Sequence, residues 1–77
     1  MKILHRFTGA VLWEDDHATI GETVEAAVRA GASLDGASLN RASLDGASLI
    51  GASLDDASLI GASLNGASLD RALLNRA

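Results

Sequence analysis

The sequence contains no cysteine, no proline and only one Trp and one Phe among its 77 residues. Without cysteine, disulfides, cysteine-ligated zinc and thiol chemistry are excluded. No apolar run approaches the roughly 18 residues of a membrane-spanning helix, and the first residues lack the basic region and apolar core of a signal peptide. The formal net charge of −4 provides no basic surface for nucleic acid. We therefore expect a soluble cytoplasmic protein that binds neither a membrane nor nucleic acid.

What the sequence has instead is a five-residue repeat. From residue 32 to residue 77 it reads ASLDG ASLNR ASLDG ASLIG ASLDD ASLIG ASLNG ASLDR ALLNR A, with no change of spacing. In an α-helix a step of five residues rotates successive leucines by roughly 140°, and in a continuous strand it alternates them between two faces. Because Ala and Leu of one unit share a face when extended, each unit must be a short extended segment followed by a corner.

The last two residues of each unit have the composition of such a corner. Gly adopts positive φ without steric cost, and Asn and Asp favour turns. Alternating segments and corners predict a coil whose Ala and Leu point to its axis, and stacked coils make an all-β solenoid. The predicted core ladder consists of Leu34, Leu39, Leu44, Leu49, Leu54, Leu59, Leu64, Leu69, Leu74, Ala37, Ala42, Ala47, Ala52, Ala57, Ala62, Ala67 and Ala72.

This run of ASLxx units resembles the pentapeptide-repeat family, whose usual unit is A(D/N)LXX. The resemblance covers residues 32–77 and implies a right-handed quadrilateral β-helix with four units per coil, hence about two coils here. Serine stands at the second position, where the family more often carries Asp or Asn. In the family's geometry that position points outward, so the substitution changes the surface and leaves the core unaltered.

Residues 1–31 do not repeat and are predicted to form an N-terminal hairpin and a capping helix in front of the repeat domain, residues 32–77. Alternating apolar residues predict two short strands around a turn at Thr8-Gly9. Thr19-x-x-Glu22 is a capping-box pattern, and Gly31 suits the end of a helix of about 20–30.

The side chains expected to cover the first coil are Phe7, Trp13, Val24 and Val28. This stretch, with Arg6-Phe7-Thr8-Gly9 and Glu22-Thr23-Val24-Glu25-Ala26-Ala27-Val28, also resembles the leader found in front of many bacterial and phage pentapeptide-repeat proteins. A natural leader of this kind is therefore expected.

Only one group of residues has ligand or acid–base potential: His5, Asp15, Asp16 and His17. We interpret it as a solvated loop plus a hairpin histidine. The repeated serines have no accompanying base, and no phosphate-binding glycine loop or metal-ligand spacing occurs. No catalytic residue, metal site or cofactor is expected, and the chain is not predicted to be an enzyme.

Four units per coil would stack residues twenty apart. Asp35, Asp55 and Asp56 then share one side beneath Asn75 and Arg76, while Ile50 and Ile60 lie on opposite sides. The other stacked pairs are Asp45 with Asn65, Asn40 with Ile60, and Ile50 with Asp70.

Two functions remain. The first is a non-catalytic structural or interaction module with an unidentified protein partner. The alternative, implied by the resemblance, is a DNA mimic that binds a type II topoisomerase such as DNA gyrase. The repeats contain five Asp and three Arg, a net charge of −2, which is far below the charge density of duplex DNA. The interaction module is therefore the preferred prediction.

The C-terminal end of the repeats is predicted to be uncovered, because Asn75-Arg76-Ala77 continues in register without a cap. Exposed sheet edges promote pairing with another chain. Leu73 stands where the other units carry serine. These features favour a homodimer through Leu73 and Leu74. The alternative is a truncated or naturally short chain that frays at this end.

Overall fold

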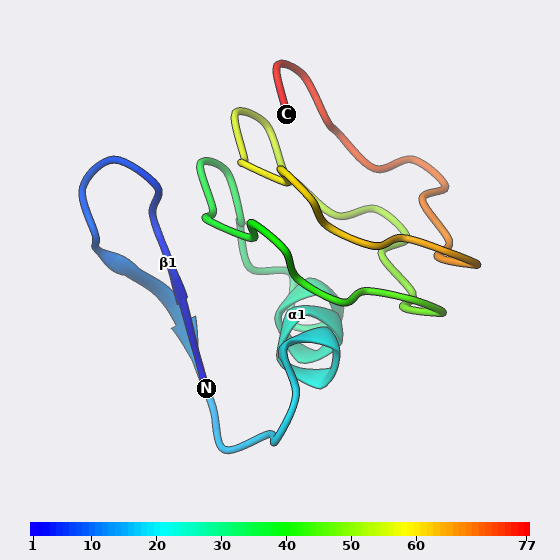
Figure 1. Cartoon of the computed structure of the whole chain (residues 1–77), viewed down its shortest axis with the longest axis horizontal. Coiled ribbons are helices and arrows are strands. Elements are labelled where there is room, and N and C mark those ends of the chain that lie inside the picture. Colours follow the sequence, from blue (N-terminus) through cyan, green and yellow to red (C-terminus); the bar gives the residue numbers. More distant parts are fainter.

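The computed structural model describes residues 1–77. Its elements are β1 (Lys2–Leu4), β2 (Val11–Glu14) and α1 (Ile20–Arg29). From residue 32 onward the chain winds in stacked coils that pair through isolated β-bridges. Figure 1 shows the hairpin and α1 beside the first windings of the coils, with the C-terminus on the far side from α1.

β1 and β2 form the antiparallel hairpin that the sequence predicted, with Ile3 opposite Trp13. Ile3 is buried at 1% exposure, whereas Phe7 is 75% exposed. The prediction that Phe7 covers the first coil is therefore wrong. Beyond β1 the chain turns, and the backbone amides of Phe7 and Thr8 donate to Nδ1 of His5. This turn takes Phe7 out of the inward alternation that begins at Ile3.

α1 begins and ends where the capping signals predicted. Thr19 Oγ1 accepts a hydrogen bond from the amide of Glu22 at the first turn. At the other end Gly31, at φ 77°, donates to the carbonyl of Val28, and the next amide donates to the carbonyl of Ala27. This Schellman arrangement satisfies the last carbonyls of a helix. No helix of the chain is long and apolar enough to cross a membrane.

Every repeat unit turns at its last two residues. The carbonyl of each central leucine accepts from the alanine three residues later, as in Ala37 N to Leu34 O at 3.0 Å. Only the fifth residue has positive φ, which defines a type II turn. Glycine occupies five of these nine corners. The other four are Arg41, Asp56, Arg71 and Arg76, at φ 59–63°.

Units twenty residues apart lie directly above one another. Parallel bridges join the second residues of these units: Ser33–Ser53, Ser38–Ser58, Ser43–Ser63, Ser48–Ser68 and Ser53–Leu73. Each coil therefore contains four units, and the repeats form a β-helix-like solenoid. We call residues 32–51 coil 1 and residues 52–71 coil 2; residues 72–77 begin a third. The first, second, third and fourth stacks are those that start at Ala32, Ala37, Ala42 and Ala47.

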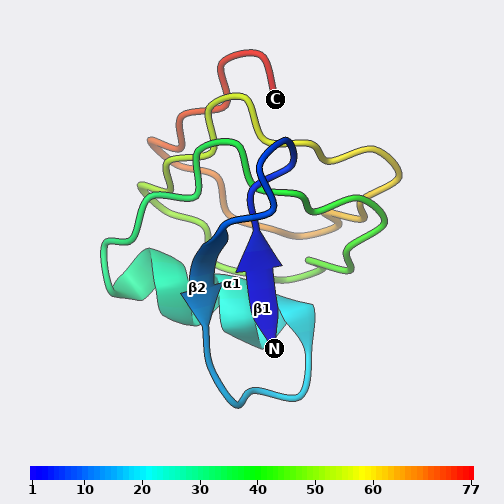
Figure 2. The same cartoon turned by 90° about the vertical axis from the view of Figure 1, so that its left-hand side faces the viewer.

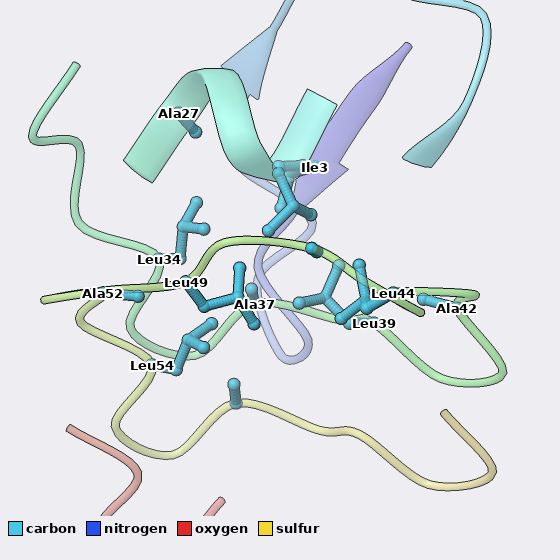
Figure 3. Packing of buried hydrophobic residues seen from close by; sticks show 13 residues of the cluster. Ile3, Ala27, Leu34, Ala37, Leu39, Ala42, Leu44, Leu49, Ala52 and Leu54 are labelled. Carbon is cyan, nitrogen blue, oxygen red and sulfur yellow. The ribbon is translucent and has the colours of Figure 1, made fainter. Parts of the chain in front are cut away.

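The interior of the coils is filled by leucine and alanine (Figure 3). From Leu34 to Leu54 the ladder leucines are 0–2% exposed, and from Ala37 to Ala57 the ladder alanines are 0–8% exposed. Val24 and Ala27 of α1 and Ile3 of β1 join this cluster. The later ladder residues are less well covered: Leu59, Ala62, Leu64, Ala67, Leu69 and Ala72 are half-buried, and Leu74 is 37% exposed.

Candidate interaction surface

The hairpin covers the second stack at the coil 1 end of the solenoid. The amide of Ser38 donates to the carbonyl of Leu4 at 2.8 Å, and the amide of Arg6 donates to the carbonyl of Gly36 at 2.7 Å. A Cβ on Gly36 would overlap the imidazole ring of His5, so glycine permits this close approach. Figure 2 shows the hairpin crossing α1, with its turn reaching over the coils.

α1 covers the third and fourth stacks at the same end. Glu25 Oε2 accepts a hydrogen bond from the amide of Ser48 at 2.8 Å. Gly21 lies so close to the coil that a Cβ on it would be 3.3 Å from the carbonyl oxygen of Ser43. Trp13 and Val28 pack against the core as partly buried side chains, and Val24 is fully buried. Both elements of the N-terminal region thus cover the edge of coil 1, and they supply acceptors for the amides of Ser38 and Ser48.

The opposite end presents the edge of coil 2. The amides of Leu59, Leu64 and Leu69 donate to no backbone carbonyl, whereas the amides of the coil 1 leucines all do. Ile60 and Leu73 are 73% and 51% exposed. A cavity of about 390 Å³ lies at this edge. It is lined by Arg6, Ala57, Ser58, Leu59, Ile60 and Ala77.

In four units the fourth residue acts as a hydrogen-bond acceptor toward the coil above: Asp35, Asn40, Asp45 and Asp55. Asp35 Oδ1 accepts from the hydroxyl of Ser53 and, at 3.0 Å, from the amide of Asp55. The amide of Asn75 donates in the same way to Asp55 at 2.9 Å. The full pattern recurs at Asn40 with Ser58 and Ile60, and at Asp45 with Ser63 and Asn65.

In the fourth stack, isoleucine takes the place of the fourth-position acceptor. Ile50 lies below Asp70, as predicted, because the amide of Gly51 donates to the carbonyl of Asp70. Ile50 has no side-chain acceptor, and the amide of Asp70 and the hydroxyl of Ser68 donate to no other group of the chain. The fourth stack is therefore the one stack between coil 1 and coil 2 without this side-chain link.

The predicted acidic side exists, and it is partly neutralised. Arg76 donates to both carboxylate oxygens of Asp56, at 2.7 and 3.1 Å. Arg6 Nη1 donates to the backbone carbonyl of Asp56 at 3.0 Å. Hydrogen bonding from Arg76 lowers the pKa of Asp56, and the same bond raises the pKa of Arg76. Both side chains are exposed, at 46% and 80%, so the pair contributes little to stability.

The four residues with ligand or acid–base potential do not form one cluster in the structure. His5 lies against coil 1, while Asp15 is a hydrogen-bond centre that joins the end of β2 to α1. Asp15 accepts from the Trp13 indole at 2.9 Å and the Thr23 hydroxyl at 2.9 Å, and it lies 2.8 Å from Nδ1 of His17. Partial burial raises the pKa of Asp15, but these hydrogen bonds outweigh it and hold the pKa well below its usual range.

Asp15 thus has a structural role in the folded chain, and Asp16 is exposed and does not join it. The structure contains no group of three or more His, Cys, Asp or Glu side chains placed to hold a metal ion.

Sequence reasoning missed the acceptors at the fourth position and the contact of Arg6 with coil 2. The fourth-position acceptors had a signal, because Asp or Asn recurs there two residues after a serine. Arg6 had none, because nothing in a short hairpin sequence indicates which coil its turn reaches.

A family model described as "Pentapeptide repeats" matches residues 30–59 and 52–77, in 8 copies. No curated protein and no solved structure is similar enough to this chain to count as a match.

Proposed function

Since the chain belongs to the pentapeptide-repeat family, we propose that it is a non-catalytic module that binds an unidentified protein through the edge of coil 2. The observation that carries this proposal is the contrast between the two ends. The edge of coil 1 is covered by the hairpin and α1, whereas the edge of coil 2 exposes unpaired amides and half-buried leucines.

The finer architecture belongs to the same proposal. We infer a right-handed quadrilateral β-helix, with residues 1–31 as a cap and residues 32–77 as the repeat domain. The four-unit coils support this inference. The cytoplasm is the expected compartment, and no catalytic residue, cofactor, membrane or nucleic acid enters the proposal.

Binding at the coil 2 edge would bury apolar surface and satisfy backbone groups together. Leu59, Leu64 and Leu69 pack against the core on one side only. Covering such side chains is favourable by roughly 25 cal/mol per Å² of apolar surface removed from water. The unpaired leucine amides would gain acceptors in the same step, which is how sheet edges bind extended peptides.

A matched pair of variants tests the proposal. Ile60→Lys places a charge and no acceptor at the coil 2 edge, and Ile50→Lys places the same charge outside the edge; both isoleucines are exposed. Immobilised chain is incubated with extract from its source cells. We expect a bound protein to be retained by the unmodified chain and by Ile50→Lys, and lost with Ile60→Lys. Equal retention by both variants would contradict binding at this edge.

A competing occupant of the same end is a second copy of the chain, which would give a homodimer through Leu73 and Leu74. These side chains are 51% and 37% exposed. The amide of Leu73 already donates to the carbonyl of Ala52, so its side chain is free to make contacts while its backbone is held.

One observation favours a second function, mimicry of DNA toward a type II topoisomerase: Asp35 and Asp55 lie one above the other. The pairing of Asp56 with Arg76 acts against it by removing negative charge from the same side. A supercoiling assay with DNA gyrase decides the question. Mimicry requires inhibition that weakens as salt rises, and full supercoiling at high protein concentration would exclude it.

A further inference from the structure

The contact between coil 1 and coil 2 shows what the coil 2 edge can bind. In the third stack, the amide of Leu44 donates to the carbonyl of Ser63, and the amide of Ser63 donates to the carbonyl of Ala42. Asp45 Oδ1 accepts from the Ser63 hydroxyl and from the amide of Asn65. The strand that is bound runs parallel, and it supplies a serine hydroxyl and a backbone amide two residues apart.

The coil 2 edge repeats the same groups in the same backbone conformation. Gly66 and Arg71 have φ values of 71° and 61°, close to the 72° of Gly46 in coil 1. The fourth positions of the third and fourth stacks carry Asn65 and Asp70, which are both exposed acceptors. This half of the edge is therefore prearranged to receive a parallel strand, which limits the entropy lost on binding.

We propose that residues 61–71 bind an extended segment of a partner protein as an added parallel strand, and that this segment has two consecutive Ala-Ser-Leu-x-x units, one on the third stack and one on the fourth. In each unit the serine hydroxyl and the amide two residues later donate to the side chain of the stack below, Asn65 in the third stack and Asp70 in the fourth. This proposal rests on the proposed interaction function, and it specifies which chemical groups the bound segment must carry. The second stack is excluded from side-chain recognition, because Ile60 offers no acceptor.

A partner protein is the occupant, because a second copy cannot present a parallel edge. The groups that would pair belong to coil 1, where α1 covers the third and fourth stacks so closely that a Cβ on Gly21 would lie 3.3 Å from the carbonyl oxygen of Ser43. The amide of Ser38 is bonded to Leu4, and the amide of Ser48 is bonded to Glu25. A second copy could meet this end only in another orientation, through apolar contact.

The test uses two synthetic peptides and the isotopically labelled 77-residue chain, at a concentration at which light scattering gives the mass of one chain. One peptide has two Ala-Ser-Leu-Asp-Gly units, and the other has both serines replaced by alanine. We expect the serine peptide to slow hydrogen exchange at the amides of Leu64 and Leu69. The alanine peptide should bind roughly tenfold more weakly, because two hydroxyl hydrogen bonds are lost.

Variants of the chain locate the acceptor. Asp70→Ala should weaken the serine peptide severalfold, whereas Asp70→Asn, which keeps an acceptor oxygen, should bind nearly as well. Asp16→Ala, in the loop before α1, should leave binding unchanged. Loss of peptide binding in all three variants would point to unfolding, which the circular dichroism spectrum of each variant reveals.

Three results would overturn the proposal: equal binding of both peptides, no protection of Leu64 and Leu69, or protection of these amides by self-association without peptide. Each leaves the proposed function separately testable, because retention of a cellular protein by the Ile50→Lys and not the Ile60→Lys variant does not depend on a strand being added.

Discussion

At the fifth position of each unit, the backbone conformation decides which residue gives the most stable turn. All nine of these residues have positive φ, and an L-residue with a side chain pays about 1–2 kcal/mol for it. Arg41, Asp56, Arg71 and Arg76 are therefore strained corners. They show that the stacking of the coils holds the turn even where glycine is absent.

Gly51→Ala measures this conformational preference directly. Gly51 has φ 74° and nothing lies within 4 Å of the position its Cβ would take. We expect a loss of about 1–2 kcal/mol in the free energy of unfolding, caused by the backbone alone. The reverse change, Arg71→Gly, should stabilise the chain. Urea denaturation of both variants checks the pair, and an unchanged midpoint for Gly51→Ala would contradict it.

Ile50→Asn should supply the acceptor that the fourth stack lacks. The amide of Asp70 and the hydroxyl of Ser68 would gain a partner, and we expect stabilisation of about 0.5–1.5 kcal/mol. Ile60→Asn is the control, because no later unit of the chain lies above Ile60 and no bond can form. Thermal unfolding distinguishes them. Equal shifts for both variants would mean that removing an exposed isoleucine, rather than a hydrogen bond, is responsible.

The role of a residue could be predicted where it depends on its own unit. The inward Leu and Ala and the turning Gly follow from spacing and local conformation. The roles of Asp35, Asn40 and Asp45 could not be derived in the same way, because their donors lie twenty residues later and depend on the number of units per coil. That number came from a family resemblance and not from the five-residue period.

The elements of the N-terminal region were predicted because their signals are local. Thr19 and Gly31 determine both ends of α1 through hydrogen bonds within a few residues. The hairpin was also predicted, but the prediction that the Phe7 side chain points toward the coils was wrong. Its direction depends on where the turn after β1 begins. The docking of the hairpin on the second stack had no sequence signal.

His5 and Gly36 couple the hairpin to coil 1. Gly36→Ala should destabilise the chain by about 1–3 kcal/mol more than Gly51→Ala, because its Cβ would overlap the imidazole ring. His5→Ala should remove that excess in the double variant. Chemical denaturation of the four-member cycle gives the coupling energy. Strictly additive effects would show that the hairpin does not rest on Gly36 in solution.

Asp15 makes the junction of β2 and α1 sensitive to acid. Its pKa is lower in the folded chain than in the unfolded chain, so the ionised form favours folding. This stabilisation is present above about pH 4 and is lost as the pH falls toward the folded pKa. Asp15→Asn should therefore lower the melting temperature at pH 7 and reduce its pH dependence below pH 4. Parallel pH profiles of both proteins would disprove this role.

At the scale of the whole molecule, the solenoid has one covered and one uncovered end. If a second copy occupies the uncovered end, the mass measured by light scattering should rise above 7.8 kDa with concentration. Leu73→Asp should keep the mass at that of one chain, because a charge would be desolvated in the interface. Ile50→Asp is the control. A constant single-chain mass for the unmodified protein would eliminate the homodimer.

The candidate site could be predicted only in outline. The sequence led us to expect an uncovered edge near Leu74, and in the structure Leu59, Leu64 and Leu69 of coil 2 are half-buried. The sequence does not show which stacks present acceptors at the coil 2 edge, or that the second stack lacks one at Ile60. These points become clear only when the units are placed above one another.

The four-unit coil also constrains how such a gene can change length. Insertion of a single unit would leave Ala and Leu pointing inward and every corner intact. It would also move each later fourth-position side chain to the neighbouring stack, so that the donors of coil 2 would meet different acceptors in coil 1. Whole coils can be duplicated without this exchange of partners. Selection on stability should therefore favour gains and losses of complete coils over those of single units.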